Sequence, residues 1–300
     1  MVYDCFMFND ELDLLELRLR FLHNTVDKFV LVESERTVSG NKKPLHYKSS
    51  QSRFREFEDK IIHLIAPAIN LSVWEYEFYQ RNYIKEGLKQ CEPDDIIFIT
   101  DVDEIIDIPS ILADKKLSLP SLIEIKMYYY FLNVETNAKW KFPLICHWKQ
   151  IENTDIGSRV NYSKNITQNV LFQTEKINGW HFSYLFGSDI KMYQEKIKTF
   201  THQEYNTIHF LNEKRISRCI NFKVDLFERP FMKLRVNKSH LSSLLPYINN
   251  TPLENLMYKK ISLKKYLSPA NIFYILHIKY YRRIKYLLVT FFSAKKADNN

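Results

Sequence analysis

Glycine is scarce in this chain. Only 5 of the 300 residues are glycine, and neither a G-x-G-x-x-G nor a Walker-type sequence occurs. Loops of those kinds cradle nucleotide phosphates with backbone N–H groups. A nucleotide bound by this protein must therefore be held by side chains or through a metal ion.

Closely spaced cysteines and a leader sequence are also missing. The four cysteines, at positions 5, 91, 146 and 219, form no C-x-x-C pair, which argues against a zinc knuckle or a disulfide framework. The first 21 residues have no basic stretch followed by an apolar one, so we expect no signal peptide or membrane anchor. These features predict a cytoplasmic protein.

The positive charge is confined to one end of the chain. The net charge is +8, but residues 251–300 hold ten Lys and Arg against two acids, and the first 250 residues are balanced at 33 of each sign. A balanced main region argues against nucleic acid as a partner. Residues 271–293 predict a basic, aromatic helix with too many charges to span a bilayer. It either contacts the inner face of a membrane peripherally or packs on its own domain.

Apolar runs and amphipathic segments alternate over the first hundred residues. This alternation predicts an α/β fold with a doubly wound, mostly parallel sheet. Beyond Pro109, aromatic alternating segments predict an antiparallel extension, and a turn-rich patch at 177–188 leads into further helices. We expect a catalytic domain over 1–235 and a helical tail over 236–300. The expected strands are 2–8, 27–34, 60–67, 95–100, 121–135 and 138–151, and the expected helices are 9–26 (capped by Asn9 or Asp10), 51–59, 74–90, 188–206 and 207–220.

The segment "DDIIFITDVDEII", residues 94–106, is the most unusual in the chain. A run of four apolar residues predicts a buried strand, and it leads into Asp101, Asp103 and Glu104. Like charges this close repel one another unless a cation lies between them. In an extended segment the Asp-x-Asp spacing puts two carboxylates on one side, within reach of one hard divalent ion. We therefore predict a metal site at the carboxyl end of this strand, where ligands bind in such sheets.

Three parts of the sequence together resemble the family-17 glycosyltransferases, the group of the β-1,4-mannosyl-glycoprotein 4-β-N-acetylglucosaminyltransferases, in a bacterial-type form. They are "FMFNDELDLLELRL" with "FVLVESERTVSG", "QRNYIKEGL…DDIIFITDVDEI", and "GWHFSYLFG…KIKTFTHQEYN". The resemblance covers roughly residues 3–230. It implies a GT-A-like fold, a UDP-sugar donor (UDP-GlcNAc), a divalent metal (Mn²⁺ or Mg²⁺) and inversion at the anomeric carbon. The acceptor would be a glycan hydroxyl, of a surface polysaccharide or a lipid-linked oligosaccharide.

The resemblance also implies roles for individual residues. Asp103 would bind the metal directly, Asp101 would contact the metal, a metal-bound water or the ribose, and His181 would complete the coordination or be structural. Glu104 and Asp107 either support the ligands or begin the next helix, and Trp180 either stacks on a sugar or fills the core. The predicted donor-binding residues are Phe8 and Asn9 (base), Glu33 (uracil or ribose), Arg81 (phosphate, or an internal salt bridge) and Asn82 (nucleotide).

Inversion requires a general base that deprotonates the attacking hydroxyl. Glu175 is our first choice and, with Asp103, makes up the predicted catalytic pair; Asp189 and Glu135 stay open as alternatives. Lys198, His202 and Glu204 either bind phosphate or acceptor or pin a helix.

Two other classes of protein deserve comparison. A haloacid-dehalogenase-type phosphohydrolase also ends an apolar strand in Asp-x-Asp, but there the motif usually opens the domain, and here strands precede it without paired acids downstream. A non-enzymatic lipid- or nucleic-acid-binding module would depend on the tail alone. The balanced charge of the first 250 residues argues against it.

Overall fold

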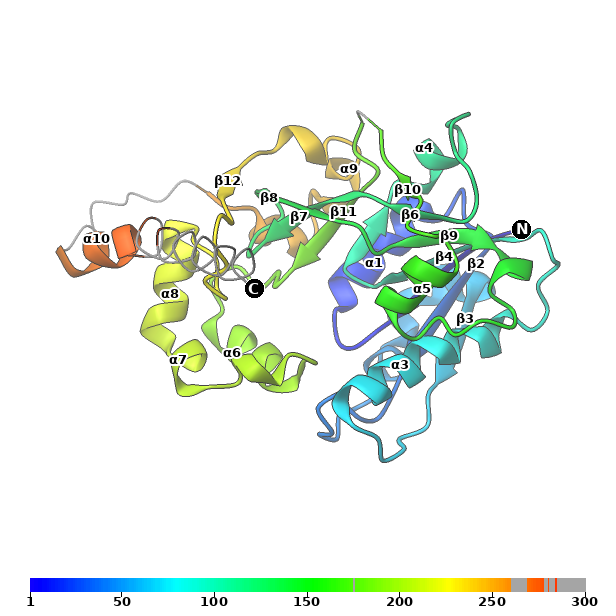
Figure 1. Ribbon diagram of the computed structural model, residues 1–300, viewed down its shortest axis with the longest axis horizontal. Helices are drawn as coiled ribbons and strands as arrows, with labels where there is room; N and C mark the ends of the chain where they lie inside the picture. The colour runs from blue at the N-terminus through cyan, green and yellow to red at the C-terminus, as the bar shows by residue number, and fades with distance from the viewer. Residues whose placement is uncertain (175, 260–268, 278–279, 281–283, 285–300) are drawn as a thin grey trace, which may run out of the picture.

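The computed structural model describes residues 1–174, 176–259, 269–277, 280 and 284. Its two β-sheets lie side by side, with helices packed around them (Figure 1). The larger sheet contains the N-terminal strand, and the smaller one is built from segments that follow the acid-rich stretch. A mixed α/β fold with parallel and antiparallel strands is thereby confirmed.

The larger sheet has seven strands in the order β10-β6-β9-β4-β1-β2-β3. Strands β3, β2, β1 and β4 are parallel, whereas β9 runs antiparallel to both β4 and β6. The parallel half forms because its strands carry apolar residues on both faces and are joined through helices. The strands are β1 Val2–Met7, β2 Lys28–Glu33, β3 Ile61–Ile65, β4 Ile96–Asp101, β6 Ser121–Ile123, β9 Leu144–His147 and β10 Leu171–Phe172.

The smaller sheet has five strands in the order β12-β8-β7-β11-β5. Here β11 is parallel to β7, and the remaining pairs are antiparallel. Strand β5 follows β4 after a turn of two residues, so the chain passes from one sheet to the other at the acid-rich stretch. The strands are β5 Glu104–Ile106, β7 Ile125–Tyr129, β8 Val134–Trp140, β11 Gly179–Ser183 and β12 Leu234–Val236.

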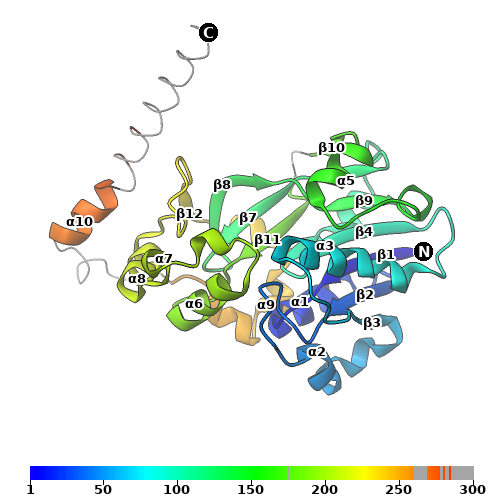
Figure 2. The ribbon, with the colours of Figure 1, turned by 60° about the horizontal axis from the view of Figure 1, so that its bottom comes forward.

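Helices cover both faces of the larger sheet. One face packs with α1 and α4 around Phe6, Leu15 and Phe98, and the other packs with η2 and α5 around Val30 and Ile97. Figure 2 shows α6, α7 and α8 grouped beyond the smaller sheet. The helices are α1 Leu12–Leu22, α2 His46–Ser49, η1 Gln51–Lys60, α3 Val73–Tyr83, η2 Ile84–Leu88, α4 Ile108–Leu112, η3 Trp148–Gln150, α5 Arg159–Asn165, α6 Ile190–Thr199, η4 Gln203–Tyr205, α7 Ile208–Leu211, α8 Glu213–Phe222, η5 Ser239–Leu241, α9 Leu245–Ile248, η6 Pro252–Leu256 and α10 Pro269–Leu276.

Residues 241–257 pack against helix α1. Leu241, Leu244 and Ile248 are fully buried in a cluster with Leu14 and Leu17 of α1. The predicted helix at 271–293 is described only in part, as α10 and isolated positions beyond it. Within the part of the chain that the structure describes, no helix is long and apolar enough to cross a membrane.

Four predictions of local structure are corrected. The first helix begins at Leu12 with Glu11 at its cap, so Asn9 and Asp10 precede the cap. The patch at 177–188 contains strand β11. The predicted strand at 121–135 divides into β6 and β7 in different sheets and reaches β8 only at its end, and the one at 138–151 divides between β8 and β9. Alternation of apolar residues predicts a strand, but it does not predict which sheet that strand joins.

Candidate functional site

Asp101, Val102, Asp103 and Glu104 form a tight turn between the two sheets, which we call the acid turn. It lies at the carboxyl end of β4, beside the end of β1, because Asp101 pairs with Met7 and the Val102 N–H donates to the Met7 carbonyl at 3.2 Å. The Asp101 N–H donates to the Glu104 carboxylate at 3.0 Å and closes the turn. The predicted acids are thus brought together where a doubly wound sheet binds its ligands.

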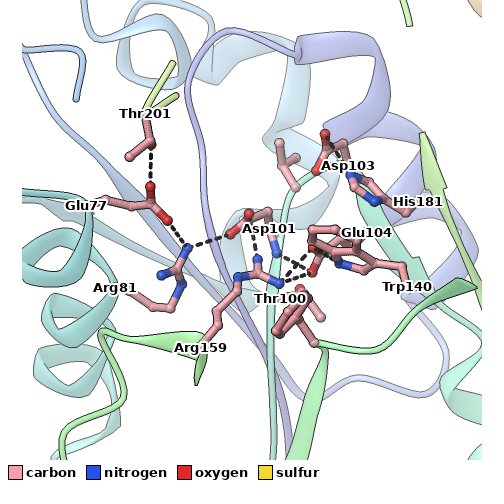
Figure 3. Close-up of polar contacts among 12 residues, drawn as sticks. Glu77, Arg81, Thr100, Asp101, Asp103, Glu104, Trp140, Arg159, His181 and Thr201 are labelled. Carbon is pink, nitrogen blue, oxygen red and sulfur yellow. Dashed lines mark hydrogen bonds and ion pairs between the residues drawn. The ribbon is translucent and has the colours of Figure 1, made fainter. Parts of the chain in front are cut away.

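Two arginines neutralise Asp101 (Figure 3). Nη2 of Arg159 lies 2.6 Å from one carboxylate oxygen, and Nη2 of Arg81 lies 3.5 Å from the other. Burial by itself would raise the pKa of Asp101, but the two guanidinium groups outweigh it and hold that pKa well below its usual range. Asp101 is therefore an anion with fixed cationic partners at neutral pH.

Glu104 connects the acid turn to the smaller sheet. Its side chain is fully buried and accepts hydrogen bonds from Trp140 Nε1 at 2.6 Å and from Arg159 Nη1 at 2.9 Å. Burial raises the pKa of Glu104, and the charge of Arg159 opposes that rise. Of the two roles predicted for these acids, the contacts of Glu104 fit support of the neighbouring ligand residues. Asp107 instead begins a helix, because it caps α4 by accepting from the Ser110 N–H at 3.3 Å.

His181 faces Asp103 from β11. Strands β11 and β5 pair in a register that sets His181 opposite Glu104, and Phe182 N–H donates to the Asp103 carbonyl at 2.8 Å. Nε2 of His181 lies 3.6 Å from the Asp103 carboxylate. Burial would lower the pKa of His181, but Asp103 outweighs it and raises that pKa above its usual value. His181 and Asp103 are thus brought together, as the resemblance implied.

A buried arginine from α1 holds the backbone of the acid turn. Nη1 of Arg18 donates to the carbonyls of Asp101 at 2.8 Å and of Glu104 at 2.9 Å. Its Nε donates to Asp4 of β1 at 2.6 Å, and both side chains are completely buried. The carbonyls of Asp101 and Glu104 therefore face α1, whereas that of Asp103 faces β11.

The side chains of the acid turn and His181 could bind a hard divalent cation only if a substrate supplied further ligand atoms. No group of three or more His, Cys, Asp or Glu side chains within the described residues could hold a metal. Asp103 and His181 supply one carboxylate and one imidazole, while Asp101 is engaged by arginines. Mg²⁺-type sites commonly use one or two carboxylates and complete their shell with substrate phosphates and water. This pair suits that kind of site.

The residues predicted to bind the nucleotide are spread around the end of β1 and have protein partners in the structure. Phe8 is buried in the core, and the Asn9 carbonyl accepts from Lys43 Nζ at 3.0 Å. Glu33 is fully buried, 2.7 Å from His63 Nε2, and accepts from the N–H groups of residues 47 and 48. The Asn82 side chain binds Asp155 and the Ile156 N–H, at 2.6 and 2.9 Å.

The candidates for the general base occupy different places. Glu175 lies outside the residues that the structure describes. Glu135 pairs with Tyr128, which pairs with Phe182, so these three side chains lie on one face of the smaller sheet. His181 precedes Phe182 on β11, and successive residues of a strand point to opposite faces, so Glu135 and His181 lie on opposite faces. There it contacts His240 Nδ1 at 2.8 Å. Asp189 caps α6 by accepting from two backbone N–H groups.

The segment after β11 reaches back to the acid turn's neighbours. Thr201 donates to Glu77, which pairs with Arg81 at 2.9 Å, so a chain of polar contacts runs from this segment to Asp101 (Figure 3). Lys196 of α6 lies 3.1 Å from Glu11 at the start of α1. Of the predicted cluster, His202 pairs with Glu204 at 2.8 Å and Lys198 with Glu195 at 2.7 Å. Trp180 is buried in the core cluster, as its structural interpretation predicted.

Arg159 and Arg18 were not predicted from the sequence. Arg159 is the first residue of α5, far along the chain from the acid turn, and nothing local marks it. Arg18 did leave a signal, because it interrupts the leucine-rich face of α1, between Leu14 and Leu22, while Asp4 interrupts the apolar strand β1. Opposite charges within two adjacent buried elements indicate an ion pair, since an unpaired charge is rarely buried.

The fold and the site together are those of an α/β protein in which two carboxylates, those of Asp101 and Asp103, lie at the carboxyl end of a central parallel strand. The profile described as Glycosyltransferase family 17 matches residues 1–232. Because this covers most of the 300 residues, the chain belongs to glycosyltransferase family 17.

Curated relatives match over shorter stretches. The β-1,4-mannosyl-glycoprotein 4-β-N-acetylglucosaminyltransferase of Rattus norvegicus is 29% identical over 114 residues, 35% of this chain and 21% of the relative. That of Homo sapiens is 30% identical over 107 residues, 32% and 20% of the two chains. The aligned part is thus about a fifth of the length of these relatives. Among solved structures, the chain is similar to 2-C-methyl-D-erythritol 4-phosphate cytidylyltransferase of Francisella tularensis. The alignment covers 60% of this chain and 88% of that one, with 15% identity and a TM-score of 0.30.

Proposed function

We propose that this protein is a metal-dependent, inverting glycosyltransferase that moves N-acetylglucosamine from UDP-GlcNAc to a hydroxyl of a glycan. The observation that carries the proposal is the pairing of Asp103 with His181 beside Asp101, at the carboxyl end of β4, in a chain of this family. The choice of sugar follows the N-acetylglucosaminyltransferases to which the chain is similar. The acceptor, a surface polysaccharide or lipid-linked oligosaccharide, stays a prediction.

Each residue has a defined task in this proposal. Asp103 and His181 would hold Mn²⁺ or Mg²⁺, which when bound neutralises charge on the departing diphosphate. Arg81 and Arg159 add fixed positive charge at the same edge, and their planar guanidinium groups match phosphate oxygens. Arg159 would then exchange part of its contact with Asp101 for the donor.

The transfer forms a bond between the acceptor oxygen and the anomeric carbon while the bond from that carbon to the diphosphate breaks. The acceptor proton passes to a carboxylate on the acceptor side. Glu175 remains our first candidate for this base. Asp189 is the alternative; the orientation of Glu135 away from His181 counts against a role for Glu135.

The test is incubation of the protein with a panel of UDP-sugars and Mn²⁺, followed by measurement of UDP release with and without a chelator. We expect UDP-GlcNAc to be hydrolysed slowly without an acceptor, in a metal-dependent way. Hydrolysis of small phosphate esters without UDP release from any UDP-sugar would instead support a phosphohydrolase.

A further inference from the structure

We propose that the buried ion pair between Asp4 and Arg18 is a positioning device that fixes the acid turn and so tunes the affinity for the metal. The proposal rests on the metal-dependent function above. Both side chains are fully buried, one on β1 and the other on α1. Neither belongs to the residues that would contact the donor.

The cost of burying the pair indicates a role beyond stability. Removing two charges from water is expensive, and well-packed apolar residues can often replace a buried pair without loss of stability. The presence of the Asp4–Arg18 pair is therefore explained best by the residues that the remaining hydrogen bonds of Arg18 hold in place. Asp4 accepts hydrogen bonds from Nε and Nη2 of Arg18, and the other hydrogen bonds of the guanidinium are made with residues 100–104.

Those contacts determine how the acid turn is oriented. Nη1 of Arg18 meets three carbonyls, those of Asp101, Val102 and Glu104, at 2.8, 3.3 and 2.9 Å. Nη2 also reaches the Thr100 hydroxyl. With three of its four carbonyls directed towards Arg18 of α1, the acid turn leaves the carboxylates of Asp101 and Asp103 to the arginines and to His181.

Arg18 suits this task because its guanidinium is a rigid fork. A lysine could still pair with Asp4, but its single ammonium group cannot bind a carboxylate, a hydroxyl and three carbonyls in one fixed plane. Groups that orient metal ligands typically contribute about 10- to 100-fold in metal affinity. The same range is expected for Arg18.

The experiment compares the full chain with three variants. D4L/R18M replaces the ion pair by apolar side chains, so that no charge is left buried alone. R18K keeps the ion pair and removes the fork. R215M is the matched control, because Arg215 is also a buried arginine, with hydrogen bonds to Glu228 and to the Leu226 carbonyl, in the aromatic cluster of α8.

Two readouts are needed: Mn²⁺ binding in the presence of UDP, followed by electron paramagnetic resonance, and hydrogen exchange at the amides of Asp101 and Val102. We expect D4L/R18M and R18K to bind Mn²⁺ about 10- to 100-fold more weakly and to exchange these amides faster. R215M should change the melting temperature alone. If D4L/R18M folds and shows the exchange rates of the unmodified protein, the positioning role is wrong.

The readouts also separate this proposal from the proposed function. If the exchange rates rise but Mn²⁺ affinity stays the same, the link to the metal is overturned while the structural contact stands. If the unmodified protein binds no Mn²⁺ with UDP, the metal-dependent function fails, and hydrogen exchange still decides whether Arg18 fixes the acid turn.

Discussion

Asp103 differs from the neighbouring acid Glu104 in how far it is exposed to solvent. Its carboxylate lies 3.6 Å from His181, and its side chain is 19% exposed, unlike the buried Glu104 one position later. The two acids are adjacent in sequence but differ in their surroundings. Partial exposure leaves Asp103 accessible to a ligand, whereas Glu104 is saturated by Trp140 and Arg159.

We predict that Asp103→Ala abolishes metal-dependent donor hydrolysis and leaves the fold intact. A metal ligand contributes several kcal/mol to stabilisation of the transition state, so UDP release should fall by about 100-fold or more. The free energy of unfolding should change by only about 0.5 kcal/mol, as at other partly exposed positions. Asp94→Asn is the control, because Asp94 is an exposed acid of the same segment. Undiminished Mn²⁺ binding in the Asp103 variant would remove it from the proposed ligands.

Glu33 allows the predicted nucleotide role to be tested against a structural one. The structure ties its carboxylate to His63 and to the backbone N–H groups of Tyr47 and Lys48. Burial would raise the pKa of Glu33, but these hydrogen bonds outweigh it and lower that pKa. The anionic form therefore contributes stability above the unfolded value of 4.5. That contribution is lost as the pH falls through the lower folded pKa.

Glu33→Gln should accordingly lower the free energy of unfolding by about 1.5–3 kcal/mol at neutral pH, the usual range for hydrogen bonds to a charged group. The difference from the unmodified protein should shrink below about pH 4, and denaturant titrations at several pH values would measure it. Glu58→Gln, at an exposed position, serves as the comparison. Weaker UDP binding at unchanged stability would favour the nucleotide role instead.

At the scale of elements, the loop before α5 brings Arg159 to the site. Helix α3 holds this loop in place, since Arg81 donates to the Gly157 carbonyl at 2.6 Å and Asn82 binds Asp155. Gly157 lies so close to α3 that an added Cβ would be 2.5 Å from the Phe78 carbonyl and 2.6 Å from Asn82. Packing against α3 therefore requires glycine, which has no Cβ, at position 157.

We predict that Gly157→Ala displaces the loop and weakens both stability and donor binding. Overpacking of this kind typically costs about 1–3 kcal/mol, and the shift would also pull Arg159 away from Asp101. Thermal unfolding and UDP-sugar binding would measure the two effects. Exposed Val160→Ala, in the first turn of α5, is a nearby control. A variant of Gly157 with normal stability would show that α3 and the loop can move apart freely.

The strands and the longer helices of the first hundred residues could be predicted because each carries its own signal, whereas the four-residue helix α2 was not predicted. Strands such as β2 and β4 are continuous apolar runs, and the charges after β4 mark the site. Strand β11 gave no comparable signal, because its five residues are held by β5 and β7 from elsewhere in the chain. Arg159 was missed for the same reason. Contacts made by tertiary packing between distant segments leave little local trace.

At the scale of the whole molecule, the position of the domain boundary is open to a direct test. The sequence predicts a catalytic domain that ends at residue 235, and the family match ends at residue 232. In the structure, however, the Trp180 Nε1–H donates to the His240 carbonyl at 2.6 Å, and the Tyr258 N–H donates to Asn133 at 2.7 Å. Residues 239–258 are therefore hydrogen-bonded to the smaller sheet and its connections, and residues 241–257 also pack against α1.

A chain cut after residue 235 should consequently fail to fold stably, whereas one cut after residue 259 should fold. Leu241, Leu244 and Ile248 are fully buried against α1, and each such side chain contributes about 1.5–3 kcal/mol. Losing all three would consume much of the roughly 5–15 kcal/mol that stabilises a typical domain, and would expose Leu14 and Leu17 on the helix that carries Arg18. Circular dichroism and thermal unfolding of the two truncated chains would measure this. A stable, cooperative fold for residues 1–235 would establish the predicted boundary, and it would show that α1 holds the acid turn without the C-terminal segment.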